Sequence, residues 1–329
     1  MDRKQQKLLK QDDMSVAEDR ISKLPNTYLH YLLSFLPTKD AVATSVLSTR
    51  WRFLWTSVPK LDFDYHGFYG SGCDDSCIST WISAIVKHKV QELDLNHSSF
   101  RGESIVLPLA LFSCTSLQVL KLSSAGVVKV PSSISFPYLK ILQLKYLEFF
   151  NECLTERFSS FPVLEDLSIS KCKWINNSNR ISISNTALKR LVMEITDSYK
   201  GGNIDFFKMN APSLVSLSWV SDYLPIECNL SDMPSLASAN VIFQKFRPER
   251  PIEEMGLVSS NILEALSHVK ALQISGQGEK PYTKDEDGWN IETVPQCSLL
   301  NLKKVEYREF DGHSMELDVI KYLLEGLVI

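Results

Sequence analysis

The side chains best suited to chemistry in this sequence are its cysteines and histidines. Cys73 and Cys77 lie close together in "CDDSC", with His66 and His88 nearby, and these residue types can bind zinc. The short Cys-x-x-Cys and His-x-x-x-His spacings of zinc sites are missing, so the sequence disfavours a metal site. The seven cysteines are an odd number spread along a long chain, which predicts reduced thiols.

Catalytic patterns are also missing from the sequence. A cysteine nucleophile needs a positioned histidine, and the six scattered histidines favour no pairing. The motifs GxSxG, HExxH and GxGxxG and the phosphate-binding P-loop do not occur. His88, His97 and His268 are expected at surface or turn positions rather than as ligands. We therefore expect a protein that is not an enzyme and that needs no cofactor or metal.

The stretch "TSVLSTRWRFLW", residues 44–55, suggests binding instead, because tryptophan and arginine are enriched at interface hot spots. Residues 18–64 are expected to form short helices, begun by Pro25, by Thr38 as a cap and by Ser48 as a cap, with Pro37 ending the first. Apolar residues at helical spacing mark these helices: Leu29, Leu32, Leu33 and Leu36, then Val42, Val46 and Leu47, then Trp51, Leu54 and Trp55.

Three helices in about forty residues cannot enclose so many large apolar side chains, since domains of that size need a partner or a staple. Two coverings remain open: the rest of the chain or a second protein. A DNA-binding helical module is disfavoured, because the third helix offers Arg50 and Arg52 among aromatic and aliphatic residues, where base contacts need polar ones.

The remainder of the chain repeats itself. The pattern L-x-x-L-x-L recurs, with substitutions, from residues 90, 117, 139, 164, 188, 214, 236, 269 and 302, at spacings of 22 to 27 residues and then twice 33. Such spacings are typical of leucine-rich repeats, in which each unit adds one strand to a parallel sheet. Prolines before several units support the strand assignment. We therefore predict an α/β fold: a leucine-rich-repeat solenoid preceded by a small all-α unit.

The residues between the buried leucines are expected to project from the concave face of this solenoid and to bind a protein target. The residues expected on that face are Lys121, Gln143, Lys145, Asp166, Arg190, Glu194, Ser218 and Asn240. They form no stripe of one charge sign, so the expected target surface has mixed character.

Composition limits the class of protein and of partner. The chain has 329 residues, 44% of them hydrophobic, which excludes a mainly disordered protein. Its net charge is -4 and its pI about 5.9, which disfavours nucleic acid as a partner. No run of eighteen apolar residues occurs and the N-terminus is polar, so we expect no membrane partner. We expect an intracellular protein, located in the nucleus, the cytoplasm or both.

The segment "LPNTYLHYLLSFLPTKDAVATSVLSTRWRFLW" closely resembles the F-box motif, and "SVPKLDFD" resembles its continuation in plant F-box and leucine-rich-repeat proteins. The resemblance implies docking onto the Skp-type linker of a cullin-RING ubiquitin ligase. Tyr28 and Ala43 depart from the usual motif, where an aliphatic and a basic residue are common. Carried over position by position, the linker-binding residues are Leu24, Pro25, Leu29, Leu32, Leu33, Leu36, Val42, Ser45, Val46, Leu47, Arg50, Trp51 and Trp55.

The rest of the chain resembles the same plant proteins. "WISAIVKHKVQELDL" and "FPVLEDLSISKC" are similar to their leucine-rich region, and "VPQCSLLNLKKVEYREFDGHSMELDVIKYLLE" is similar to the C-terminal module called FBD. Between "ALQISGQ" and "VPQCSLL" the family usually has more leucine-rich sequence, and after "YLLEG" the FBD pattern usually continues. We therefore expect a shortened form with an incomplete last repeat and cap.

The predicted organisation has six parts: a flexible tail 1–17, an F-box 18–64, a linker 65–89, a leucine-rich-repeat solenoid 90–275, a polar loop 276–290 and a truncated FBD-like module 291–329. The predicted function is that of a substrate-recognition adaptor in an SCF-type ubiquitin ligase, a non-catalytic subunit that also reaches cullin through the linker. The alternative is a leucine-rich-repeat scaffold without a role in ubiquitination.

Overall fold

The computed structural model describes residues 20–21, 23–58, 60–64, 82–83, 86–97, 107–124, 127–128, 134–149, 158–174, 180–196, 204–231, 233–245, 252–276 and 303–308. The chain divides into two compact units, Met1–Pro59 and Lys60–Ile329. We call the first unit the head and the second unit the solenoid, and each is described by itself.

The head consists of short helices. They are α1 (Asn26–Leu33), α2 (Thr38–Ala43), the 3-10 turn η1 (Thr44–Val46) and the 3-10 helix η2 (Trp51–Ser57). Pro25 and Pro37 occupy the N-cap positions of α1 and α2, and their carbonyl oxygens accept the first backbone hydrogen bonds of each helix. Proline is suited to a helix start because its fixed φ and missing N–H cost nothing there.

Three details of the predicted head are wrong. Thr38 is the first residue of α2 rather than its cap, and η2 begins at Trp51, with Arg50 rather than Ser48 at the N-cap. Residues 60–64, expected among the helices, form strand β1 (Lys60–Asp64) at the start of the solenoid sheet. Alternation of Leu61 and Phe63 with polar residues in "KLDFD" suits a strand better than a helix.

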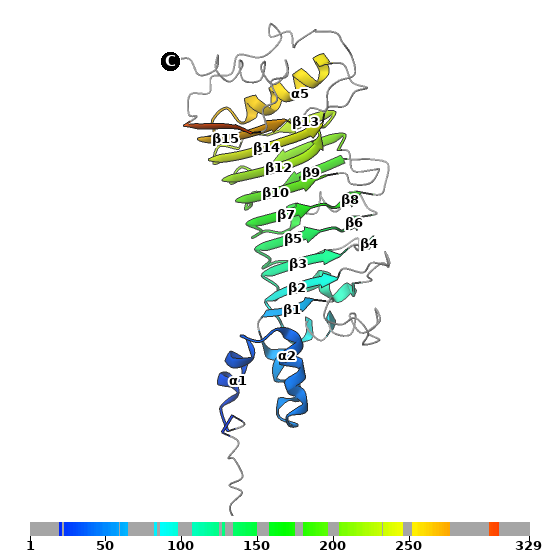
Figure 1. Ribbon diagram of the computed structural model, residues 1–329, viewed down its shortest axis with the longest axis vertical. Coiled ribbons are helices and arrows are strands. Elements are labelled where there is room, and N and C mark those ends of the chain that lie inside the picture. Colours follow the sequence, from blue (N-terminus) through cyan, green and yellow to red (C-terminus); the bar gives the residue numbers. More distant parts are fainter. Residues whose placement is uncertain are drawn as a thin grey trace, which may run out of the picture. The chain divides into compact units, whose positions relative to one another are not determined.

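The solenoid is built on a parallel sheet of ten strands, stacked in chain order in Figure 1. Its strands are β1 (Lys60–Asp64), β2 (Glu92–His97), β3 (Val119–Ser124), β5 (Ile141–Lys145), β7 (Asp166–Ser170), β10 (Arg190–Ile195), β12 (Ser216–Tyr223), β14 (Ser238–Lys245), β15 (Ala271–Gly276) and β16 (Lys304–Arg308). All nine predicted repeats contain one of these strands, so the predicted leucine-rich-repeat fold is confirmed.

The pairing register explains why the leucines recur. Neighbouring strands pair so that their buried residues form continuous rows, one of which is Leu93, Leu120, Leu142, Leu167, Leu191 and Leu217. Every residue in this row is buried. Burying one leucine contributes about 1.5–3 kcal/mol, and no single repeat can cover its own row. Stacking of repeats is therefore what stabilises the sheet.

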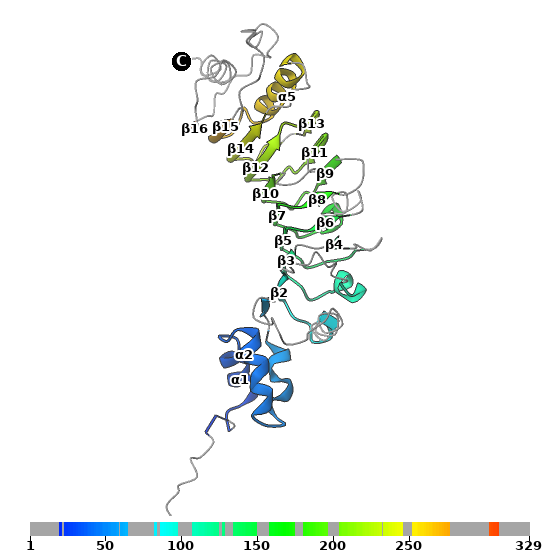
Figure 2. The same ribbon diagram turned by 45° about the vertical axis from the view of Figure 1, so that its right-hand side comes forward.

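A second layer lies on the other side of this core, as Figure 2 shows. It contains one sheet of β9 (Arg180–Ser184), β11 (Phe206–Asn210) and β13 (Glu227–Leu230), and a second of β4 (Val127–Val128), β6 (Glu148–Phe149) and β8 (Lys173–Trp174). The helix α5 (Ile252–Ala265) and the 3-10 helices η4 (Leu109–Ser113) and η5 (Phe158–Ser160) complete the described elements here. The ring centroids of Trp219 in β12 and Phe207 in β11 lie 4.4 Å apart, and this contact joins the two layers.

A turn with the sequence x-Pro-x-Leu introduces several strands. In four repeats the leucine N–H donates to the carbonyl oxygen three residues earlier; the donors are Leu139, Leu164, Leu214 and Leu236. Proline favours the second position of such turns because its φ is already set. Phe136 and Phe161, which precede two of these prolines, pack edge to face with centroids 5.5 Å apart and so connect successive repeats.

Candidate functional site

The head has a small closed core of its own. Leu29 and Leu33 on α1, Ala41 on α2, and Trp51 and Leu54 on η2 are all buried. The guanidinium of Arg50 secures the start of α1, because it donates to the main-chain oxygen of Leu24 and to Asn26 Oδ1. The helices of the head therefore pack against one another through the buried faces of α1 and η2.

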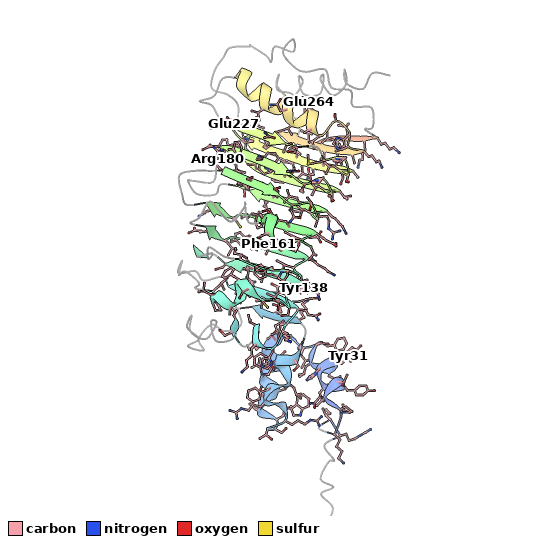
Figure 3. All side chains as sticks on the ribbon, turned by 180° about the vertical axis from the view of Figure 1, so that it is seen from behind. Tyr31, Tyr138, Phe161, Arg180, Glu227 and Glu264 are labelled. Carbon is pink, nitrogen blue, oxygen red and sulfur yellow. The ribbon has the colours of Figure 1, made fainter. Side chains whose placement is uncertain are left out.

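A second group of apolar side chains in the head remains exposed. Val46 is 87% exposed and Leu47 64% exposed, both at the end of α2 and η1. Tyr31 on α1 and Phe35, two residues after the end of α1, are 64% and 67% exposed and pack edge to face with centroids 4.8 Å apart (Figure 3 labels Tyr31). Exposed aliphatic and aromatic side chains of this number are typical of a surface that binds another protein.

The predicted linker-binding residues divide into three groups in the head. The exposed group is Pro25, Leu32, Leu36, Val42, Val46, Leu47 and Arg50. The half-buried group is Leu24, Ser45 and Trp55, and the buried group is Leu29, Leu33 and Trp51. In this conformation the exposed group can contact a partner directly, while the buried group holds the helices in place.

Sequence reasoning left four exposed aromatic residues of the head out of the predicted set, namely Tyr28, Tyr31, Phe35 and Phe53. Tyr31 and Phe35 could have been found from their spacing, because residues four apart on a helix lie on the same face. Phe53 follows Arg52, whose guanidinium lies 5.5 Å from the ring centroid. These residues extend the apolar surface beyond the predicted positions.

All eight residues that the sequence predicts on the target-binding side lie on one face of the ten-stranded sheet, which we call the open face. It consists of the strand residues that alternate with the buried rows, and its members are half-buried or exposed. Lys121, Gln143, Ser218 and Asn240 occupy one row of it, across β3, β5, β12 and β14. Asn240 Nδ2 lies 3.4 Å from Ser218 Oγ, within this row.

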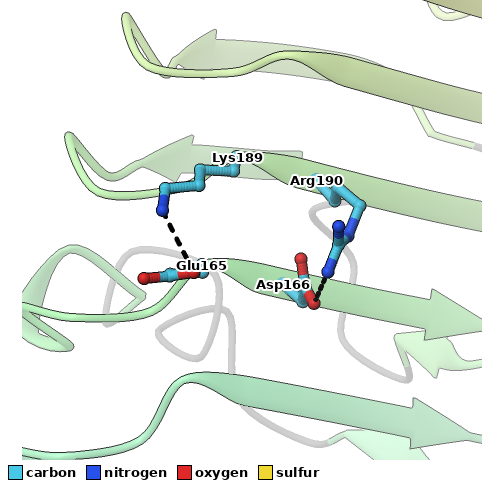
Figure 4. Close-up of polar contacts among 4 residues, drawn as sticks. All are labelled: Glu165, Asp166, Lys189 and Arg190. Carbon is cyan, nitrogen blue, oxygen red and sulfur yellow. Dashed lines mark hydrogen bonds and ion pairs between the residues drawn. The ribbon is translucent and has the colours of Figure 1, made fainter.

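Charged residues of the open face pair with neighbours on adjacent strands. Lys121 Nζ lies 3.6 Å from Asp94 Oδ2, and Lys171, just after β7, reaches Glu194 Oε1 at 3.4 Å. Arg190 donates to Asp166 Oδ2, which raises the pKa of the guanidinium through that hydrogen bond and the nearby negative charge. Figure 4 shows this pair beside a second one, Lys189 with Glu165.

The open face changes character along the sheet. From β2 to β10 it carries the charged pairs, whereas the half-exposed positions of β12 and β14 are uncharged: Ser216, Ser218, Val220, Ser238, Asn240 and Ile242. A target bound along the whole face would therefore need both charged and neutral segments. This mixture agrees with the lack of a single-sign charge stripe in the sequence.

Comparisons with known proteins bear on both units. A family model described as "FBD-associated F-box protein At5g56370, LRR repeats" matches residues 78–277, the F-box domain model matches 21–63 and the FBD model matches 290–326. The F-box/FBD/LRR-repeat protein At5g56420 of Arabidopsis thaliana is 32% identical over 382 residues, covering 94% of this chain and 89% of its own. The chain belongs to the F-box/FBD/LRR-repeat family.

Two further relatives have both F-box and FBD in their names. The FBD-associated F-box protein At5g56370 of Arabidopsis thaliana is 28% identical over 339 residues, covering 93% of this chain and 72% of its own. The FBD-associated F-box protein At5g38590 is 28% identical over 382 residues, covering 94% and 91%. No solved structure matches the chain.

The family match also shows a difference in length within the aligned region. The alignment with At5g56420 extends over 382 positions, more than the 329 residues of this chain, so that relative has segments with no counterpart here. Of the FBD match, the structure describes only residues 303–308, which include β16. The predicted incomplete cap at 291–329 otherwise lies outside the described residues.

The described residues of this F-box protein contain no group of three histidine, cysteine or acidic side chains able to hold a metal ion. Cys73, Cys77 and His66 lie outside the described part of the chain, and His88 is exposed on a turn. His268 is half-buried, with Nε2 2.6 Å from the main-chain oxygen of Met233. Within the described ranges no helix is long and apolar enough to cross a membrane.

Proposed function

We propose that this chain is the substrate-recognition adaptor of an SCF-type cullin-RING ubiquitin ligase. The observation that supports this proposal most directly is the exposed apolar surface of the head, which belongs to a unit matched by the F-box domain model. In this proposal the surface is covered by the Skp-type linker, which in turn connects the chain to cullin. The chain itself is then a non-catalytic subunit, and ubiquitin transfer is carried out by its partners.

The physical reason for this assignment is that the exposed residues are not needed by the head itself. Its core is already closed by Leu29, Leu33 and Trp51, so Val46 and Leu47 contribute nothing to it. Burying each such side chain in an interface contributes about 1.5–3 kcal/mol, which favours association with an apolar surface. Leu32, Leu36 and Val42 are exposed as well, and their burial would add to the free energy of association.

The solenoid supplies the second half of the proposed function, binding of a protein target through the open face. Holding a target beside the ligase raises its effective concentration without any bond being made by the adaptor. The charged pairs of β2 to β10 and the neutral positions of β12 and β14 are the groups that would select it. We also propose a nuclear or cytoplasmic location, where such a ligase could meet its targets.

The experiment is co-elution of the purified full chain with the Skp-type linker. Val46→Asp with Leu47→Asp should abolish co-elution, because two charges would be placed in an apolar interface without partners. Leu109→Asp is the matched control, since Leu109 is 72% exposed in the solenoid and undergoes the same chemical change. Trp51→Ala is unsuited to this test, because Trp51 is buried and its loss would disturb the head.

Co-elution that persists in the Val46→Asp, Leu47→Asp variant would exclude this surface as the linker site. A wild-type chain that fails to co-elute at all would favour the alternative function, a leucine-rich-repeat scaffold with no part in ubiquitination.

A further inference from the structure

A pocket of about 440 Å³ opens at the edge of the solenoid where the strands begin, beside β2, β3 and β5. One side is formed by the residues that directly precede these strands: Gln91, Gln118 and Lys140. The other side is formed by the third residues of three successive turns: Ser116, Tyr138 and Val163. These residues precede β2, β3, β5 and β7, so the pocket follows four repeats along one edge of the sheet (Figure 3 labels Tyr138).

The charge of this pocket is entirely positive. Lys89 and Lys140 line it, and no aspartate or glutamate does. Neither lysine makes an ion pair with any residue in the part of the chain that the structure describes. The next carboxylate along the edge, that of Glu165, is engaged by Lys189 at 3.2 Å (Figure 4).

This arrangement differs from the same edge in later repeats. There Lys189 is paired with Glu165, and the residues before β12 and β14 are the uncharged Val215 and Ala237. Lys270 and Lys303, which precede β15 and β16, are cationic as well but do not line this pocket. Two lysines without an ion pair to a described residue and a recess in the surface thus coincide beside β2, β3 and β5. A lysine ammonium is a compact charge with three donors, which suits the oxygens of an anion.

Neutral donors and carbon surface complete the lining. The carboxamides of Gln91 and Gln118 and the hydroxyl of Thr115 offer further hydrogen bonds. The hydroxyl of Ser116 is less available to donate to a ligand, because it donates to the main-chain oxygen of Val90 at 2.8 Å. The ring of Tyr138 and the side chain of Val163 add apolar surface, which a bare inorganic ion would not use.

We propose that this pocket binds a phosphorylated side chain of a target protein, with an apolar residue beside the phosphate. A phosphomonoester carries about -1.5 to -2 charges near neutral pH and three acceptor oxygens. Two unpaired lysines match that charge, whereas a single carboxylate would leave one of them uncompensated. Recognition of a target in this way rests on the proposed adaptor function, although binding of the phosphate group does not.

The probe is a fluorescent pentapeptide, Ala-Leu-phosphoserine-Leu-Ala with blocked ends, titrated into the full chain by fluorescence anisotropy. Peptides with serine or aspartate at the centre, and inorganic phosphate as a competitor, complete the set. We expect the phosphopeptide to bind at least tenfold more tightly than either peptide. We also expect Lys89→Gln and Lys140→Gln each to weaken it about tenfold, because each removes one charge-assisted hydrogen bond.

Lys270→Gln is the matched control, because Lys270 is an exposed lysine that precedes β15 on the same edge, away from this pocket. Equal losses in Lys270→Gln and Lys140→Gln would overturn the proposal in favour of general attraction to a basic edge. If the aspartate and phosphoserine peptides bind equally, or if inorganic phosphate competes as strongly as the peptide does, the ligand of the pocket is not a phosphorylated side chain. No binding of the phosphopeptide would overturn the site itself.

The same variants separate this proposal from the adaptor function. Lys89→Gln and Lys140→Gln should still co-elute with the Skp-type linker, since neither lies in the head. Loss of phosphopeptide binding with linker binding intact tests the pocket alone, and failure of the wild-type chain to bind the linker tests the adaptor function alone.

Discussion

The carboxamide of Asn185 bonds to the turn of a neighbouring repeat, because its Nδ2 atom donates to the main-chain oxygens of Phe158 at 2.7 Å and Phe161 at 3.0 Å. Its Oδ1 atom accepts a hydrogen bond from the N–H of Ala187 at 2.9 Å. Asn185 is buried, so water does not compete for these groups. One polar side chain thereby makes hydrogen bonds to the backbone of a turn whose phenylalanines, Phe158 and Phe161, pack edge to face.

Replacement of Asn185 should therefore destabilise the solenoid well beyond the loss of one side chain. In Asn185→Ala the carbonyl oxygens of Phe158 and Phe161 lose their side-chain donor, and the N–H of Ala187 loses its acceptor. We therefore expect the free energy of unfolding to fall by about 2–3 kcal/mol. Urea unfolding followed by circular dichroism measures this change. Asn229→Ala, at an exposed position of β13, should stay within about 0.5 kcal/mol of wild type. Equal effects of the two substitutions would contradict the structural role of Asn185.

The division of the head into core and surface residues predicts that two aromatic substitutions differ in their effect on the stability of the head. Trp51→Ala removes a buried ring and should destabilise the head by about 3–5 kcal/mol. Hydrogen exchange should then show loss of protection in peptides covering α1, with the solenoid strands still protected. Phe53→Ala, at a position 63% exposed, should leave this protection unchanged. Retained protection in Trp51→Ala would mean that the head core lies elsewhere.

Sequence reasoning identified all nine repeat strands because two apolar residues spaced two apart mark each of them. It missed β1, whose apolar pair of Leu61 and Phe63 directly follows the helical segment. It also missed the second layer and α5, since short strands such as Phe206–Asn210 lack the repeated leucines. The spacing of 33 residues before β15 was the available signal for α5, because a longer repeat must hold an additional element.

The candidate sites were less predictable, because they depend on packing rather than on type and spacing. Helical spacing groups Leu32 and Leu36 with Leu29 and Leu33, yet the first two are exposed and the last two are buried. The pocket at the strand edge depends on residues from four repeats meeting in register. Lys89 and Lys140 are distant in the sequence, and nothing in it says that neither makes an ion pair with a described residue.

The ion pair of Asp166 with Arg190 allows a test of the open face that keeps its internal contact. The exchange Asp166→Arg with Arg190→Asp reverses the pattern of charge but retains one pair on the surface. Exposed pairs contribute little net stability, so the urea midpoint should stay within error of wild type. The set of proteins retained by the immobilised chain, measured by mass spectrometry with the proteasome inhibited, should change.

The matched control for this exchange is the neighbouring pair, altered as Glu165→Lys with Lys189→Glu. These residues directly precede β7 and β10 and lie outside the open face (Figure 4). The retained proteins should therefore stay the same. An unchanged set in the Asp166 and Arg190 exchange would place target recognition away from this part of the open face.

Burial of Cys172 predicts a dependence of stability on alkaline pH. Burial raises the pKa of its thiol from the ordinary value of 9.0 to about 12, although backbone hydrogen bonds lower it slightly. Above pH 9 the unfolded chain ionises this thiol while the folded chain does not, so stability is lost as pH rises through that window. Between pH 9 and pH 10 the free energy of unfolding should fall about 1 kcal/mol more in wild type than in Cys172→Ala, measured by urea unfolding. Parallel falls in the two proteins would show that the thiol titrates normally in the folded chain.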